Sequence, residues 1–207
     1  VQTSSSTGQI SELQQQALLQ EDLANWEKAL QCWEKVLFYQ SQEHGENSME
    51  VAGTLCQLAR VMVEEGNHEG ALHLYHAAAK KYNTIEAPVP NDLISRVSQL
   101  YCQMKLWPDG KMWLENLLAQ SQTEEEKCRI YFELGKLHLE EGHIDKASEA
   151  LCEGEKHSDS DDEHLFKLLQ KVEFLQQQAD PNGSNMVLTS ITEGEDESTL
   201  GSILGST

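Results

Sequence analysis

The segment from Thr54 to Tyr82 reads TLCQLARVMVEEGNHEGALHLYHAAAKKY, and Gly66 divides it into two apolar patterns. Both patterns have the i, i+3, i+4, i+7 spacing of a half-buried helix. Their residues are Leu55, Leu58, Ala59 and Met62 before the glycine, and Ala71, Leu74, Tyr75 and Ala78 after it. Ala59 and Ala71 are small enough to let two helix axes approach closely. The segment therefore predicts two antiparallel helices, with Gly66 at a helix end that needs positive φ.

The order of these residues resembles the tetratricopeptide repeat, whose pattern has leucine, a small residue, tyrosine, glycine, alanine, a large aromatic residue and alanine at the same offsets. The matching residues are Leu58, Ala59, Met62, Gly66, Ala71, Tyr75 and Ala78. The resemblance implies helix pairs that stack into a right-handed superhelical solenoid. It implies no single activity, because this architecture hosts many binding functions.

Three further segments carry the same pattern. Their second-helix residues are Trp26, Ala29, Trp33 and Val36 in the first unit, Trp107, Gly110, Leu114 and Leu117 in the third, and Ile144, Ala147 and Leu151 in the fourth. The turn glycine is five residues before the core alanine in the second unit (Gly66 to Ala71) and in the fourth (Gly142 to Ala147), whereas Lys105 stands at this position in the third unit. The interval of 42 residues from Ala29 to Ala71, with Val51 and Ala52 in its second half, resembles the kinesin light chain subtype of the repeat.

Composition and periodicity divide the chain into four parts. Residues 1–9 are polar and are expected to be mobile, and residues 10–158 hold the repeats. Residues 159–179 predict an amphipathic helix, capped by Ser160 and Glu163, that covers the last pair. Residues 180–207 are acidic and predict a disordered tail. The predicted fold is an all-α solenoid of about four antiparallel helix pairs with a C-terminal capping helix.

Charge and cysteine content narrow the classes of partner and the compartment. A formal net charge of −20 disfavours nucleic acid and anionic membranes as partners. No apolar run reaches the length of a membrane span, and the N-terminal residues lack the basic and apolar regions of a signal peptide. Five cysteines without a CxxC motif predict reduced thiols and a cytoplasmic location, with nuclear or cytoskeleton-associated locations as alternatives.

Motifs that carry chemistry are missing from the sequence, which has no glycine-rich phosphate loop, GxSxG or HExxH. We therefore expect a protein that is not an enzyme and needs no cofactor. His73 and His76, with His68 or Cys56 nearby, offer zinc ligands at helical spacing. Two matched ligands do not make a zinc site, so we interpret these histidines as exposed helix residues and expect no metal.

In tetratricopeptide repeats the first helices line a concave groove, so the resemblance implies that their outward positions contact ligands. These positions are Gln57, Arg60, Arg96, Gln99, Arg129, Phe132 and Lys136. Four cations in one groove of an acidic protein favour an acidic peptide or partner helix, and Phe132 with Leu139 offers an apolar subsite. The same cations could instead pair with carboxylates along or between helices, such as Glu64, Glu133 or Glu140.

The sequence thus predicts a non-catalytic scaffold or adaptor that binds a peptide or partner helix in its concave groove. An alternative is a structural subunit that assembles with copies of itself or with a larger complex through convex or end surfaces. A third possibility is a regulatory part of a larger enzyme, since the chain opens on Val1. The acidic stretch 189–204 could also occupy the groove as an autoinhibitory segment.

Overall fold

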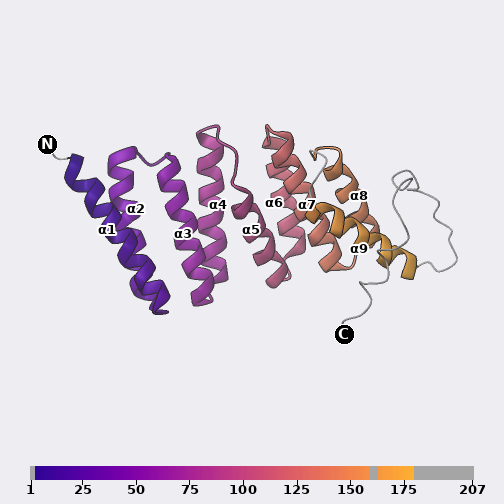
Figure 1. Cartoon of the computed structure of the whole chain (residues 1–207), viewed down its shortest axis with the longest axis horizontal. Coiled ribbons are helices and arrows are strands. Elements are labelled where there is room, and N and C mark those ends of the chain that lie inside the picture. The colour runs from indigo at the N-terminus through magenta and orange to yellow at the C-terminus, as the bar shows by residue number, and fades with distance from the viewer. Residues whose placement is uncertain (1–2, 159–162, 180–207) are drawn as a thin grey trace.

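A computed structural model describes residues 3–158 and 163–179, and the regular structure in these ranges is α-helical. The helices stand side by side in chain order, with α1 at one end of the molecule and α8 and α9 at the other (Figure 1). Their bounds are α1 Thr3–Asp22, α2 Trp26–His44, α3 Met49–Glu65, α4 His68–Thr84, α5 Asn91–Gln103, α6 Trp107–Gln120, α7 Glu124–Glu141, α8 Ile144–Glu155 and α9 Glu163–Ala179. This confirms the predicted solenoid of four antiparallel pairs followed by one further helix. Within the described ranges, none of the helices is long and apolar enough to cross a bilayer.

The same turn closes each of the four helix pairs. One residue in it has positive φ: Ala24 (54°), Gly66 (90°), Lys105 (56°) and Gly142 (89°). The backbone N–H of this residue donates to the carbonyl three residues back, and the next N–H donates to the carbonyl five residues back. This is the Schellman arrangement, which satisfies the last carbonyls of a helix. The turns at Gly66 and Gly142 and the replacement by Lys105 were predicted, whereas the equivalent role of Ala24 is visible only in the structure.

Small residues lie where the two helices of a pair approach each other. Each first helix has its small residue seven positions before the positive-φ residue, and each second helix has one five positions after it. These residues are Ala17, Ala59, Ser98 and Gly135 in the first helices and Ala29, Ala71, Gly110 and Ala147 in the second helices. All eight are buried. A Cβ added to Gly135 would lie 2.7 Å from Leu151 Cδ2, so a larger residue here would force the Leu151 side chain to shift.

Three apolar clusters form the core along the solenoid. One joins α1, α2 and α3 around Trp33, and the largest runs from α3 to α7 around Tyr75 and Ile94. The third joins α7, α8 and α9 through Leu151 and Val172. Helix α9 therefore covers the open side of the last pair, as terminal elements of a solenoid must.

The structure corrects the prediction for the N-terminal segment and leaves parts of two others outside its range. Helix α1 begins at Thr3, so residues 3–9 are helical, and Gln9 Nε2 donates to the Tyr39 hydroxyl of α2 at 3.1 Å. The predicted cap residue Ser160 and the predicted tail 180–207, including the stretch 189–204, lie outside the described residues.

Candidate functional site in the groove of the first helices

A cavity of about 600 Å³ lies between α5, α7 and α9. Three of the residues predicted to contact ligands line it, namely Gln99, Phe132 and Lys136. The other lining residues are Ser95, Ser98, Cys102, Glu133, Leu137, Leu139, Glu140, Lys167 and Leu168. Apolar side chains and charges of both signs thus meet in one hollow on the first-helix side of the solenoid.

A fully buried carboxylate lies at the wall of this cavity. Glu133 has no exposed surface, and its oxygens accept hydrogen bonds from Ser95 Oγ at 2.8 Å and from Lys136 Nζ at 2.7 Å. Arg129 Nε lies 3.7 Å from the same carboxylate, and Arg129 Nη2 donates to Ser95 Oγ at 2.6 Å. These contacts offset the cost of removing a charge from water. Sequence analysis named Glu133 as a possible partner of the cations, but it did not predict its complete burial.

The Phe132 ring lies beside both cations of this group. Arg129 Cζ is 5.3 Å and Lys136 Nζ is 5.4 Å from the ring centroid, within the range of cation–π attraction. Arg129 and Lys136 share the single carboxylate of Glu133, so these three side chains keep one net positive charge. The side chains of both cations are only partly buried, and Arg129 Nε is a buried donor that lacks a hydrogen-bond partner among the described residues.

The remaining predicted cations are paired elsewhere in the groove. Arg60 on α3 forms an ion pair with Glu21 at the end of α1, and its Nε donates to Gln57 Oε1 at 3.1 Å. Glu21 also accepts from Trp33 Nε1 at 2.7 Å. Gln57 and Arg60 do not line the cavity of α5, α7 and α9. The first two repeats therefore use Arg60 to connect α1 with α3.

Arg96 on α5 forms an ion pair with Asp92 one turn earlier, with Nε 2.7 Å from the carboxylate oxygen. Arg96 is not among the residues that line the cavity.

Burial raises the pKa of the Cys56 thiol to about 12 and the pKa of the Tyr75 hydroxyl to about 12. Both groups therefore stay protonated at neutral pH, and Cys56 is not poised as a nucleophile.

Sequence analysis missed two contributions to the groove. It assigned the C-terminal helix only to covering the last pair, whereas Lys167 and Leu168 of α9 also line the cavity. It also missed Glu21 and Asp92 as partners of the groove arginines. The acidic residue four positions before Arg96 is a signal that could have found Asp92. Glu21 is 39 residues from Arg60, and helical periodicity contains no information about that pairing.

The histidines weighed as zinc ligands lie on α4 in different surroundings. His73 is exposed. His76 Nε2 is 3.0 Å from the Tyr101 hydroxyl, and its ring stacks on Trp113 with centroids 5.6 Å apart. Burial, and then the charge of His73, lowers the pKa of His76. His76 is therefore a packing residue between the second and third pairs.

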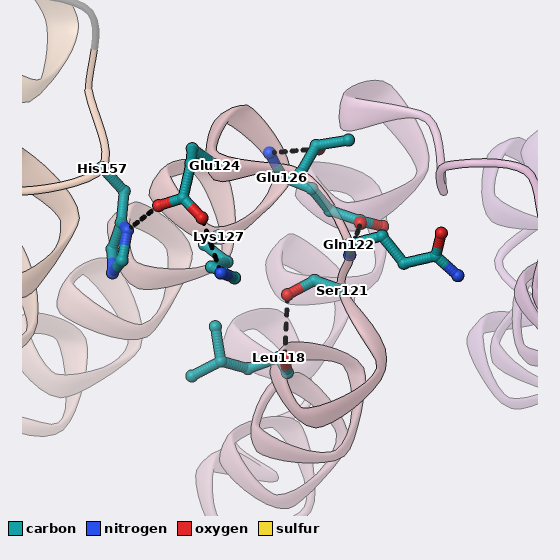
Figure 2. Close-up of polar contacts among 8 residues, drawn as sticks. Leu118, Ser121, Gln122, Glu124, Glu126, Lys127 and His157 are labelled. Atoms are coloured by element: carbon teal, nitrogen blue, oxygen red, sulfur yellow. Dashed lines mark hydrogen bonds and ion pairs between the residues drawn. The ribbon is translucent and has the colours of Figure 1, made fainter.

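A second cavity, of about 340 Å³, lies where the loop after α4 meets the loop before α7. Glu126 of its lining is buried and accepts hydrogen bonds from the backbone N–H groups of Val89 (3.1 Å) and Gln122 (3.3 Å). Thr123 Oγ1 accepts from Glu126 N–H, which is the first hydrogen bond of a capping box, whereas the Glu126 side chain accepts from Gln122 and not from Thr123. Figure 2 shows this start of α7, with Glu124 between His157 and Lys127. Glu126 is used to join two loops, which favours a structural role for this cavity.

No family model and no curated protein matches the sequence. The structure is similar to BtubC (BKLC) from P. vanneervenii, with a TM-score of 0.54 and 15% identity over 89% of this chain and 71% of that one. It is also similar to a Podosopora anserina putative kinesin light chain with nearly identical TPR-like repeats (TM-score 0.52, 15% identity, 82% and 96% covered). A third similar structure is MamA from Desulfovibrio magneticus RS-1, with a TM-score of 0.50 and 15% identity over 83% of this chain and 97% of that one. At this identity the likeness establishes the fold, and the chain accordingly has the tetratricopeptide-repeat fold that its sequence pattern predicted.

Proposed function

We propose that this protein is a non-catalytic scaffold that binds an acidic peptide or partner helix in the groove of its first helices. The observation that carries the proposal is the arrangement of Phe132, Arg129 and Lys136 around the buried carboxylate of Glu133, at the wall of a cavity of about 600 Å³. The solenoid fold supports it, because stacked helix pairs create extended concave surfaces.

The cavity combines the two features that peptide recognition needs. Phe132, Leu139 and Leu168 supply an apolar subsite for one anchoring side chain. Arg129 and Lys136 exceed the charge of Glu133 by one, so a carboxylate beside that anchor gains an electrostatic partner. An acidic residue next to an apolar one is therefore the ligand feature that fits this part of the groove.

The titratable groups of the groove support binding rather than catalysis. Burial raises the pKa of the Cys56 and Cys102 thiols, so both remain protonated at neutral pH. Glu133 is held by three partners and has no exposed surface, which makes it a poor general base. All five cysteines are free thiols, which supports a reducing compartment such as the cytoplasm.

Selection of displayed random peptides on the full chain tests the proposal. We expect selected peptides to pair an acidic residue with an apolar one, and to lose affinity at high salt. Lys136→Glu and Phe132→Ala are each expected to weaken the best peptide at least about tenfold, because each removes one element of the subsite. Lys80→Glu is the matched control, since Lys80 is exposed on α4 and does not line the cavity. Equal binding by Lys136→Glu and Lys80→Glu, or selection without acidic residues, would contradict the proposal.

Assembly through the end of the solenoid is the second candidate function, and exposed leucines at the C-terminal end of α1 and in the turn after it favour it. Leu18, Leu19 and Leu23 are 48%, 55% and 59% exposed. An apolar face of this kind is typical of a surface that another helix covers. Light scattering over a range of concentrations tests self-assembly. An average mass that increases with concentration in the wild type, but not in the double variant Leu19→Glu/Leu23→Glu, would support this alternative. A constant monomer mass would reject self-assembly.

A further inference from the structure

Three potential metal ligands converge at the turn between α7 and α8. They are His138 in the last turn of α7, Glu141 at its end and His143 just before α8. Their ligand atoms all lie within 4.8 Å of one another. Glu141 Oε2 is 2.9 Å from His143 Nδ1 and 4.0 Å from His138 Nδ1.

The backbone of the turn holds the two histidines together. The N–H of His143 donates to the carbonyl of His138 at 2.8 Å, and this Schellman hydrogen bond closes the loop that contains both histidines. Gly142, with φ 89°, supplies the positive φ that this turn needs. The imidazole ring centroids are 6.4 Å apart as a result. The main chain of the turn thus brings the two histidines close to each other.

The repeat itself does not require these residue types. The corresponding positions of the other turns hold Gln20, Leu23 and Asn25 in the first pair, Met62, Glu65 and Asn67 in the second, and Tyr101, Met104 and Leu106 in the third. All four turns form the same hydrogen bonds. The second turn also has a glutamate, Glu65, but the two histidines occur only in the fourth turn, and closing the helix pair does not explain them.

One ligand atom in the cluster is an unsatisfied polar group. His138 Nδ1 is buried and has no hydrogen-bond partner among the described residues, although the nearest carboxylate oxygen is only 4.0 Å away. A buried polar atom without a partner is costly, and an ion between it and Glu141 would remove that cost. The ion would lie close to the protein surface, because the His143 side chain is half exposed.

From these observations we infer that His138, Glu141 and His143 form a binding site for a divalent transition-metal ion such as Zn²⁺. Two imidazoles and one carboxylate are a donor set that suits zinc, and they leave a fourth position for water or a partner's side chain. A tetrahedral ion with bonds of about 2.0–2.1 Å needs its ligand atoms about 3.3 Å apart. The present separations bracket that value, so small side-chain rotations bring the three atoms into place.

Lys111 competes with the ion for Glu141. Its ammonium group on α6 lies 2.5 Å from the same Oε2 atom that faces both histidines. In the metal-free protein this ion pair neutralises the carboxylate. Binding of the ion requires Lys111 to move to the other carboxylate oxygen or into solvent.

Calorimetric titration of the full chain with Zn²⁺ under reducing conditions tests the inference. We expect one site per chain and a higher melting temperature in the presence of Zn²⁺. His138→Ala, Glu141→Gln and His143→Ala should each weaken binding at least about tenfold. Lys111→Met should strengthen it, because the competing ammonium is gone. His73→Ala, on α4, is the control and should bind like the wild type.

Cobalt substitution separates this site from binding by the five cysteines. We expect Co²⁺ to give the visible spectrum of nitrogen and oxygen ligation, without a thiolate-to-metal charge-transfer band. His143→Ala is the variant least able to disturb the fold, since the His143 side chain makes no helix-cap hydrogen bond. Unchanged Zn²⁺ affinity in His143→Ala, a charge-transfer band from thiolate, or weaker binding in Lys111→Met would overturn the inference.

Discussion

Ser95 on α5 donates a hydrogen bond to Glu133 on α7, with Oγ and Oε1 2.8 Å apart across 38 residues of sequence. The same hydroxyl oxygen accepts from Arg129 Nη2 at 2.6 Å. One serine thus connects a buried carboxylate to a groove cation and joins the third helix pair to the fourth. Networks of this kind are stabilising when every member is satisfied and costly when one is removed.

Glu133→Gln should destabilise the protein by about 2 kcal/mol, because it removes the charge that accepts hydrogen bonds from Ser95 and Lys136 while it keeps the side-chain shape. Chemical denaturation measures the change. Glu140→Gln is the matched control, since Glu140 is exposed at the same cavity and should alter stability by less than about 0.5 kcal/mol. Equal effects of the two substitutions would show that the buried network contributes nothing.

The same substitution should also tighten binding of an acidic peptide if the groove binds as proposed. Without the Glu133 charge, Arg129 and Lys136 have no internal carboxylate to share. The affinity of a peptide selected on the wild-type chain, measured by fluorescence anisotropy, should rise in Glu133→Gln. In Glu140→Gln, the affinity should rise only by the small amount that the loss of one negative charge from the protein causes. A lower affinity in folded Glu133→Gln would argue against an anionic ligand.

Glu126→Ala should cost about 2 kcal/mol, because it leaves the buried N–H group of Val89 and the part-buried N–H group of Gln122 without their acceptor. The loop before α5 should loosen locally, so the Val89 amide should exchange with deuterium faster than in the wild type. Glu125→Ala, one residue earlier and exposed, is the control for loss of an acidic residue in the first turn of α7. Val89 protection that stays at the wild-type level would contradict the role of Glu126.

Lys105→Gly should stabilise the protein by about 1 kcal/mol, because Lys105 has φ 56° and glycine adopts that conformation without steric strain. The opposite change in stability is expected for Lys80→Gly inside α4, which should destabilise the protein by about 1 kcal/mol because glycine has a low helix propensity. Thermal unfolding of the two variants beside the wild type makes the comparison. A destabilising effect at both lysines would mean that the left-handed conformation at Lys105 carries no strain.

Stability should fall below pH 6.5 in a way that depends on His76. Its pKa in the folded protein is lowered from 6.5 by burial and by the charge of His73. Between the lowered pKa and 6.5, the unfolded chain binds a proton that the folded chain does not, so stability rises with pH in that window.

His76→Gln should flatten this dependence, and it keeps a polar group near the Tyr101 hydroxyl. Denaturation midpoints above and below pH 6.5 measure the difference between the variant and the wild type. His44→Gln, at an exposed position of α2, controls for the loss of one histidine. Identical pH dependence in His76→Gln and the wild type would contradict the prediction.

Local patterns in the sequence were enough to predict the helix pairs and three of their four turns. Apolar spacing and the positive φ of Gly66 and Gly142 are local properties, so they could be predicted without knowing what packs against them. The same spacing predicted that Arg60, Arg96, Arg129 and Lys136 lie on first helices, which the structure confirms. Their role in binding a ligand stays a prediction.

The packing of the helices, in contrast, fixes which charges meet and which residues enclose the groove. The pairs Arg60 with Glu21, Ser95 with Glu133 and Lys111 with Glu141 each connect different helices over 30 residues or more. The contribution of Leu168 on α9 to the cavity is of the same kind. Such contacts depend on the rise and rotation from one helix pair to the next. Helical periodicity contains no record of that geometry, because it specifies the face on which a residue lies and not the neighbour that the face meets.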